Sequence, residues 1–181
     1  MCGIVSVVSA SGEFDLEYPL SLIAHRGPDA KGVYTEDNNG CFVGLSHVRL
    51  SVIDLDEKAN QPFISSCGNY IICYNGEIYN YCELRTQFLS AEEFKTSSDT
   101  EVLLKLYIKY GKKMLNSLDG MFAFTIYDKV QNILFCARDQ LGIKPLYYTE
   151  DNGLIFASEI KPILACKRQS PEVSAYALYE F

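Results

Sequence analysis

Short segments of apolar and β-branched residues recur along the chain, and this pattern predicts strands. The first segment is GIVSVVS at 3–9, which begins directly after the second residue. The second is CFVGLSHVRL at 41–50, and the third is NYIICYN at 69–75. The third segment leads into Asn75-Gly76, a dipeptide that is a strong turn signal. Towards the end of the chain the pattern returns, and it predicts strands over MFAFTIYD, NILFCAR, PLYYTE and GLIFAS.

The middle of the chain has apolar residues at helical spacing instead. Helices are predicted over 78–89, IYNYCELRTQFL, and over 99–110, DTEVLLKLYIKY. The second of these follows a capping box that starts at Ser98, and Gly111 is a natural position for its end.

Shorter helices are predicted towards the two ends of the chain. DLEYPLSLIA at 15–24 is a short helix broken or bent at Pro19, and HRGPDAKG at 25–32 is a loop. The last residues, SPEVSAYALYEF, predict a helix with Pro171 in its first turn.

The order of these elements is strands, then helices, then strands, without the regular alternation of a parallel sheet. It predicts antiparallel sheets with helices stacked on their faces. The sequence contains no internal repeat, low-complexity segment or linker, and its 181 residues suit one domain with a sizeable core.

Charge and cysteine usage exclude several classes of function. The net charge of -7 argues against binding to nucleic acid or to anionic membranes. No apolar run approaches the roughly 20 residues that span a bilayer, and the first residues lack a secretory signal, so we expect a cytoplasmic protein. The seven cysteines form no CxxC pair, and no metal site is expected. Cys41, Cys73 and Cys136 lie in apolar runs and are expected to be small core residues.

The first three residues, Met-Cys-Gly, carry a possible nucleophile. A small second residue allows Met1 to be removed, and Cys2 then bears a thiol and a free α-amine. The amine has a reference pKa of about 7.7–8.0 and can act as a base near pH 7. Since the thiolate is the reactive form, a nearby base activates Cys2 without a histidine.

Two further residue sets would complete a site for acyl transfer from an amino acid. Asn75 and Gly76 can offer a side-chain amide and a backbone N–H to an oxyanion. Arg49, at a strand end, can bind a carboxylate, and Asp99, at a helix start, can bind an ammonium. Each set taken singly is more commonly an ordinary turn or a solvated surface.

In combination, the chain closely resembles the N-terminal glutaminase domain of asparagine synthetases. These are class II glutamine amidotransferases of the N-terminal-nucleophile hydrolase type. The resemblance covers nearly all 181 residues and rests on nine motifs in order: MCGI, HRGPDA, LSHVRLSVIDL, QPF, YNGEIYN, SDTEV, DGMFAF, RDQLGIKPLYY and ASEIK. It implies an α+β fold, a four-layer α/β/β/α sandwich of two antiparallel sheets.

The resemblance also implies roles for individual residues. Cys2 would be the nucleophile, its α-amine the base, and Asn75 and Gly76 the oxyanion donors for L-glutamine. Arg49 would bind the substrate carboxylate, and Asp99 its ammonium. Further implied residues are Arg26, which would favour the thiolate, and the pocket lining of Leu50, Val52, Ile53 and Glu77. His25 and His47 receive no catalytic role, and Asp139 and Lys144 are expected to be structural charges in a turn.

The synthetases of this family continue into an ATP-pyrophosphatase domain with a Gly-rich phosphate loop, which this sequence lacks. We therefore expect the glutaminase domain at 2–170, and at 171–181 the start of a connection to a synthetase domain supplied in cis or in trans. The chain would be a shortened form or one half of a split enzyme. No cofactor is expected in the glutaminase domain, and ATP and Mg would act only in the absent domain. A homodimer is compatible with the sequence.

Several functions remain open from the sequence. Aspartate is the ammonia acceptor that the resemblance favours, but related enzymes amidate sugars or peptides. A non-catalytic domain kept for assembly or regulation is a second reading. A redox-sensing thiol protein is a third, and it would need a resolving cysteine close to Cys2.

Overall fold

Two antiparallel sheets form the centre of the molecule in the computed structural model, which describes residues 1–10, 12–150, 153–167 and 174–180. The five-stranded sheet has the order β2-β3-β1-β9-β8, and the four-stranded sheet has the order β4-β5-β6-β7. Their bounds are β1 Gly3–Ser9, β2 Ala30–Asn38, β3 Cys41–Arg49, β4 Phe63–Ile64, β5 Tyr70–Ile78, β6 Gly120–Asp128, β7 Ile133–Arg138, β8 Tyr147–Glu150 and β9 Leu154–Ala157.

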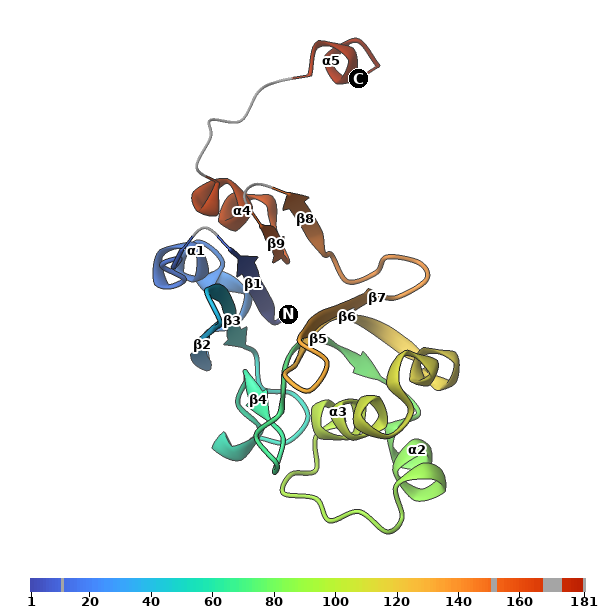
Figure 1. The fold of residues 1–181 in the computed structure, drawn as a ribbon. Helices are drawn as coiled ribbons and strands as arrows, with labels where there is room; N and C mark the ends of the chain where they lie inside the picture. Colours follow the sequence, from blue (N-terminus) through green and yellow to red (C-terminus); the bar gives the residue numbers. More distant parts are fainter. Residues whose placement is uncertain (11, 151–152, 168–173, 181) are drawn as a thin grey trace.

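The helices are α1 Glu17–Ser21, α2 Tyr81–Phe88, α3 Asp99–Tyr110, α4 Ile160–Cys166 and α5 Ala175–Glu180, with short 3-10 turns at Ala24–Arg26, Glu57–Ala59 and Gly111–Ser117. One pair of helices covers the outer face of each sheet, α1 and α4 on the five-stranded sheet and α2 and α3 on the four-stranded sheet, so the molecule has four layers (Figure 1). One apolar cluster lies between α1, α4 and the five-stranded sheet, and another between α2, α3 and the four-stranded sheet. A third lies between the two sheets and includes Ile4, Leu45 and Ile71. The predicted α/β/β/α sandwich is confirmed.

The prediction of a turn at 75–76 is wrong. β5 continues through both residues to Ile78 and pairs with β6, where Asn75 lies opposite Ala123 and Gly76 opposite Phe122. A glycine is needed at 76 for a different reason, because a Cβ there would lie 2.4 Å from the Met121 carbonyl oxygen. The pairing with β6 therefore overrides the local turn preference.

Other boundaries differ in smaller ways from the predictions. α2 begins at Tyr81, after the end of β5, and the predicted loop at 25–32 gives way to β2 at Ala30. β4 and α4 were not predicted. The closing helix is present from Ala175, whereas Pro171 lies outside the described residues.

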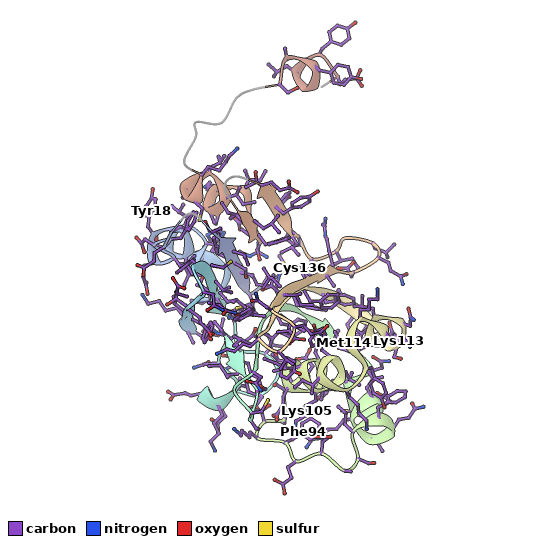
Figure 2. All side chains as sticks on the ribbon, viewed as in Figure 1. Tyr18, Phe94, Lys105, Lys113, Met114 and Cys136 are labelled. Carbon is purple, nitrogen blue, oxygen red and sulfur yellow. The ribbon has the colours of Figure 1, made fainter. Side chains whose placement is uncertain are left out.

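The predicted capping box at α3 is half confirmed. The Ser98 side chain accepts a hydrogen bond from the Glu101 N–H, as expected. The Glu101 carboxylate does not return to Ser98; it accepts from the N–H groups of Lys95 and Thr96. The preceding loop is further held by Phe94, whose ring lies under the Lys105 ammonium, 5.1 Å from the ring centroid (Figure 2). The start of α3 is thus fixed from several sides.

The cysteines are all free thiols, and their burial only partly matches the core prediction. Cys73 is fully buried, but Cys41 and Cys136 are partly exposed, while Cys166, for which no prediction was made, is buried. Within the described part of the chain, no helix combines the length and the apolar character required to cross a membrane.

Candidate active site

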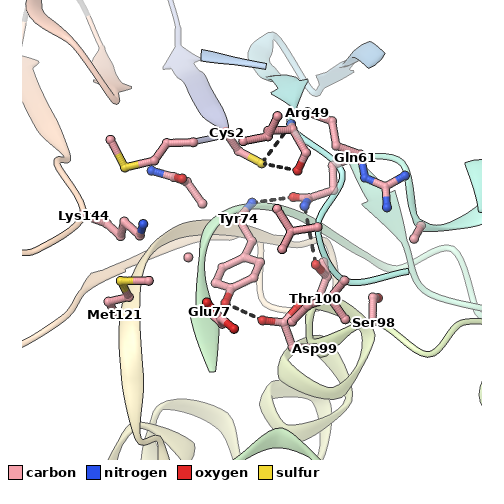
Figure 3. A pocket seen from close by; sticks show the side chains of 17 residues that line it. Cys2, Arg49, Gln61, Tyr74, Glu77, Ser98, Asp99, Thr100, Met121 and Lys144 are labelled. Carbon is pink, nitrogen blue, oxygen red and sulfur yellow. Dashed lines mark hydrogen bonds between the residues drawn. The ribbon is translucent and has the colours of Figure 1, made fainter. Parts of the chain in front are cut away.

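A cavity of about 240 Å³ opens where the first residues of the chain meet the ends of β3 and β5 and the start of α3 (Figure 3). The cavity is lined by nine of the ten site residues that were predicted from the sequence. They are Cys2, Arg49, Leu50, Val52, Ile53, Asn75, Gly76, Glu77 and Asp99. The tenth, Arg26, lies behind Cys2 and is described below. Met1 also lines the cavity.

The Cys2 thiol faces the cavity and contacts the backbone of Leu50. Sγ lies 3.6 Å from the Leu50 carbonyl oxygen and 3.4 Å from the Leu50 nitrogen. Burial raises the pKa of Cys2 above its ordinary value, although the Leu50 N–H, the amino terminus and Arg49 act in the opposite direction. The resting group is therefore a thiol at neutral pH, and it requires a base before it can act as a nucleophile.

The Asn75 side chain provides an unused donor in the cavity wall. Asn75 is 1% exposed, and its Nδ2 atom has no hydrogen-bond partner among the described residues. A buried polar group without a partner typically costs about 1–3 kcal/mol. Such a donor is suited to a negatively charged oxygen that is present only during a reaction.

Arg49 is buried at the end of β3 and is held by the loop that follows it. Nη1 donates to the Asp56 carbonyl at 3.1 Å and to Asn60 Oδ1 at 2.7 Å, and Nη2 donates to the Asp54 carbonyl. A guanidinium has five N–H donors, so two of the Arg49 donors are not used by these acceptors. The side chain is thus fixed and can still bind a carboxylate.

Asp99 lies at the first position of α3 and is 4% exposed. Its Oδ2 accepts from the Tyr74 hydroxyl at 2.7 Å and from the Ile78 N–H at 3.1 Å. Burial raises the pKa of Asp99, while these hydrogen bonds act to lower it. A cation placed beside Asp99 would favour its ionised form.

Arg26 contacts the main chain of the nucleophile and not its sulfur. Nε donates to the Cys2 carbonyl at 2.9 Å, and Nη1 donates to Glu159 Oε1 at 3.0 Å. The cationic groups that lower the pKa of the Cys2 thiol are the amino terminus, which belongs to Met1 in this structure, and Arg49. This position beside Cys2 agrees with the sequence interpretation, and the effect of Arg26 on the thiolate stays a prediction.

Several cavity residues were missed by the sequence analysis. Gln61, in the QPF motif, accepts from the Tyr74 N–H at 2.6 Å through Oε1 and lies 3.4 Å from the Thr100 hydroxyl through Nε2. Lys144 was interpreted as a structural charge, yet its side chain lines the cavity (Figure 3). Asp139 is structural, as predicted, since its carboxylate accepts from four backbone N–H groups, those of Phe122, Leu141, Ile143 and Lys144.

The two histidines lie away from the reacting atoms. His47 is fully buried between the sheets, where Nε2 lies 3.0 Å from the Tyr74 carbonyl. Burial lowers its pKa to about 4, so it is neutral at physiological pH. His25 is on the surface and contacts Glu159.

Comparison with known proteins decides the family. A family model for the glutamine amidotransferase domain matches residues 1–181. The chain belongs to this family. It is therefore an enzyme domain of the glutamine amidotransferase type, as the motifs around Cys2 and Asn75 indicated.

Relatives of this glutamine amidotransferase domain are longer proteins. The putative asparagine synthetase [glutamine-hydrolyzing] 2 of Methanocaldococcus jannaschii is 42% identical over 185 residues, which cover 92% of this chain and 36% of the relative. Asparagine synthetase B [glutamine-hydrolyzing] of Escherichia coli is 41% identical over 156 residues, which cover 85% of this chain and 27% of the relative. Amidase chry2 of Gibberella zeae is 42% identical over 180 residues, which cover 91% of this chain and 26% of the relative. The chain thus spans about a quarter to a third of the length of these relatives.

Proposed function

We propose that this domain hydrolyses L-glutamine to glutamate and ammonia, with Cys2 as the nucleophile. The observation that carries the proposal is the content of one cavity: a thiol, a buried guanidinium, a buried carboxylate and an amide donor that has no partner among the described residues. An amino acid with a side-chain amide has a complementary group for each of them.

Substrate binding follows from the charges of the cavity. The two remaining donors of Arg49 bind the α-carboxylate of glutamine, and Asp99 binds its α-ammonium. Both protein charges are almost fully buried, and ion pairs and hydrogen bonds are stronger there than in water. The side-chain amide of the substrate then points towards Cys2.

The chemistry starts only after Met1 is removed, because the Cys2 nitrogen is otherwise an amide and cannot accept a proton. The free α-amine takes the thiol proton, through a water molecule, and Sγ attacks the amide carbon. Asn75 Nδ2 and the Gly76 N–H stabilise the oxyanion. The C–N bond breaks, the α-ammonium returns a proton to the leaving nitrogen, and ammonia departs. Water hydrolyses the γ-glutamyl thioester, which yields glutamate and regenerates the thiol.

The ammonia acceptor is proposed from the names of the relatives. We propose that a longer protein containing this domain uses ATP and Mg in a synthetase domain to convert aspartate to asparagine. Because a similar relative is named an amidase and not an asparagine synthetase, we keep a second candidate, the same glutaminase serving a different acceptor, a sugar or a peptide. Formation of asparagine from glutamine, aspartate and ATP by the full-length protein would separate the two candidates.

The glutaminase proposal is tested by glutamate release from glutamine by the purified protein lacking Met1. Cys2→Ala should reduce the rate to background, whereas Cys82→Ala, which alters an exposed thiol, should leave it unchanged. An extension in front of Met1 should abolish the rate while the circular dichroism spectrum stays the same. Glutamate release by Cys2→Ala at the rate of the unmodified protein would contradict the proposal. It would leave the assembly and redox-sensor readings in place.

A further inference from the structure

The proposed nucleophile lies just outside the strand that carries it. β1 begins at Gly3, whose register partner is Val48, so Cys2 is one residue beyond the last strand pair. Once Met1 is removed, Cys2 is the end of the chain. Chain ends are poorly ordered unless other groups tie them down, so the contacts that hold the Cys2 backbone matter for the position of its sulfur.

We propose that Glu159 is a positioning residue for Cys2 and that it acts through the guanidinium of Arg26. The inference rests on the proposed function, because it assigns Glu159 a part in glutamine hydrolysis. Glu159 follows β9 and precedes α4, and it is absent from the described lining of the cavity. Its effect on the reaction would therefore be indirect.

A continuous chain of contacts joins Glu159 to the nucleophile. Glu159 Oε1 accepts from Arg26 Nη1 at 3.0 Å, and Arg26 Nε donates to the Cys2 carbonyl at 2.9 Å. Hydrogen bonds from Arg26 and His25 lower the pKa of Glu159, although burial alone would raise it. Glu159 is therefore ionised at neutral pH, and His25 must be the donor in its 3.0 Å contact with the same oxygen.

Burial makes Arg26 dependent on Glu159. The Arg26 side chain is 9% exposed, and Glu159 is the carboxylate that pairs with it in the described part of the chain. A buried cation is stable only when an anion and hydrogen bonds compensate for its lost hydration. Without Glu159, the guanidinium would turn towards water, and its bond to the Cys2 carbonyl would be lost.

The surrounding residues are arranged to admit this contact. A Cβ at Gly3 would lie 3.3 Å from Arg26 Cδ and 2.8 Å from side-chain atoms of Ile23 and Val48, so only glycine leaves room there. Ser158 holds the next residue of β1, because its N–H donates to the Ile4 carbonyl and its hydroxyl accepts from the Ile4 N–H, both at 3.0 Å. Three backbone atoms at the start of β1 are therefore held by residues 158–159. Ser158 holds the Ile4 nitrogen and carbonyl directly, and Glu159 holds the Cys2 carbonyl through Arg26.

The expected consequence is a loss of turnover with little change in substrate affinity. Arg49 and Asp99 would still bind glutamine, but the sulfur would be displaced relative to the amide carbon. A misplacement of about 1 Å can reduce a rate about 100-fold. We therefore expect Glu159→Ala to reduce kcat about 10- to 100-fold, with KM for glutamine within about twofold. Glu159→Gln keeps an acceptor oxygen at the same reach and should lose less.

The experiment compares steady-state glutamate release by these variants with that of Glu17→Ala. Glu17 forms an ion pair with Lys31 on the exposed surface at 3.1 Å and serves as the matched control; its substitution should change neither kcat nor KM. Glu159 makes no side-chain hydrogen bond as the N-cap of α4, so its substitution does not remove a helix cap. Melting temperatures measured alongside identify any variant that does not fold.

A double-mutant cycle tests whether Glu159 acts through Arg26. The double variant Glu159→Ala/Arg26→Ala should have the same kcat as Arg26→Ala alone, because interacting residues are non-additive. Three results would overturn the inference. The effects of the two substitutions could be fully additive, kcat could be unchanged in a folded Glu159→Ala variant, or KM for glutamine could rise by the same factor as kcat falls. The proposed function fails separately, if the unmodified protein lacking Met1 releases no glutamate.

Discussion

At the scale of single residues, the site combines two buried charges that hydrogen bonds already hold in place with an amide donor that is free in the described part of the chain. Arg49 and Asp99 are both held by hydrogen bonds before any ligand binds, which reduces the entropy lost on binding. Asn75 Nδ2 has no partner among the described residues. A donor of this kind gains more from the transition state than from the ground state, and such interactions accelerate a reaction.

Asn75→Ala should therefore affect catalysis much more than stability. Loss of one oxyanion donor typically costs about 3–4 kcal/mol, and we expect kcat to fall by about 10²- to 10³-fold. The melting temperature should change little, because Nδ2 has no hydrogen bond to the described residues that the substitution could remove. Steady-state glutamate release is the measurement, with exposed Asn116→Ala as the control; a rate within threefold of the unmodified protein would exclude the assigned role.

Asp99→Asn should act on substrate affinity instead. The asparagine keeps an acceptor for the Tyr74 hydroxyl but loses the charge that binds the substrate ammonium. Hydrogen bonds to charged groups contribute about 1.5–3 kcal/mol, so KM should rise about 10- to 100-fold. Because burial raises the pKa of Asp99, the unmodified domain should lose affinity for glutamine as the pH falls, at a higher pH than an ordinary aspartate would cause. An unchanged KM in Asp99→Asn would contradict the assignment.

At the scale of elements, the sequence predicted those strands and helices whose apolar pattern is strong. β1, β3 and α3 follow their predicted ranges closely. β2 was missed because it is an edge strand whose alternate residues are exposed, so its sequence, AKGVYTEDN, carries few apolar residues. The extension of β5 through Gly76 depends on the approach of β6, which a local pattern does not contain.

The residues of the site could also be predicted only where a local sequence motif indicates them. Cys2, Asn75, Arg49 and Asp99 could be nominated from motifs, and all four line one cavity. Lys144 could not, because its place in the wall depends on a turn that folds around the Asp139 carboxylate. Glu159 lies 133 residues from Arg26 in sequence, and nothing in its neighbours indicates that contact.

The start of α3 offers a stability test at the element scale. Ser98 is 2% exposed and caps the helix through the Glu101 N–H. Ser98→Ala should lower the free energy of unfolding by about 1 kcal/mol, measured as a shift of the urea midpoint. Ser66→Ala, at an exposed position, should produce no shift; equal midpoints for the two variants would show that the cap does not stabilise the domain.

At the scale of the whole molecule, a few polar contacts cross the apolar layer between the sheets. His47 on β3 bonds the Tyr74 carbonyl on β5, and the Ser6 and Thr125 hydroxyls lie 2.8 Å apart between β1 and β6. These contacts fix how the two sheets are placed, and thereby how Cys2 from one sheet faces Asn75 from the other.

The buried His47 predicts a pH dependence of stability. Its pKa is about 4 in the folded protein against 6.5 when exposed, so the unfolded chain takes up a proton first as the pH falls. The free energy of unfolding should therefore decrease from pH 6.5 downwards, by about 2 kcal/mol between pH 7 and pH 5 from this group alone. His47→Gln can keep a donor to Tyr74 but does not titrate, and urea unfolding at both pH values should show a correspondingly smaller decrease. An identical decrease in both proteins would refute the prediction.

The central claim, that Cys2 is the nucleophile for glutamine, is tested most directly by the intact mass of the purified protein. The mass is measured before and after treatment with 6-diazo-5-oxo-L-norleucine, a glutamine analogue that alkylates such nucleophiles. We expect a protein that lacks Met1 and gains one adduct, mapped to Cys2 and prevented by excess glutamine. A protein that lacks Met1 and gains no adduct at Cys2 would contradict the claim.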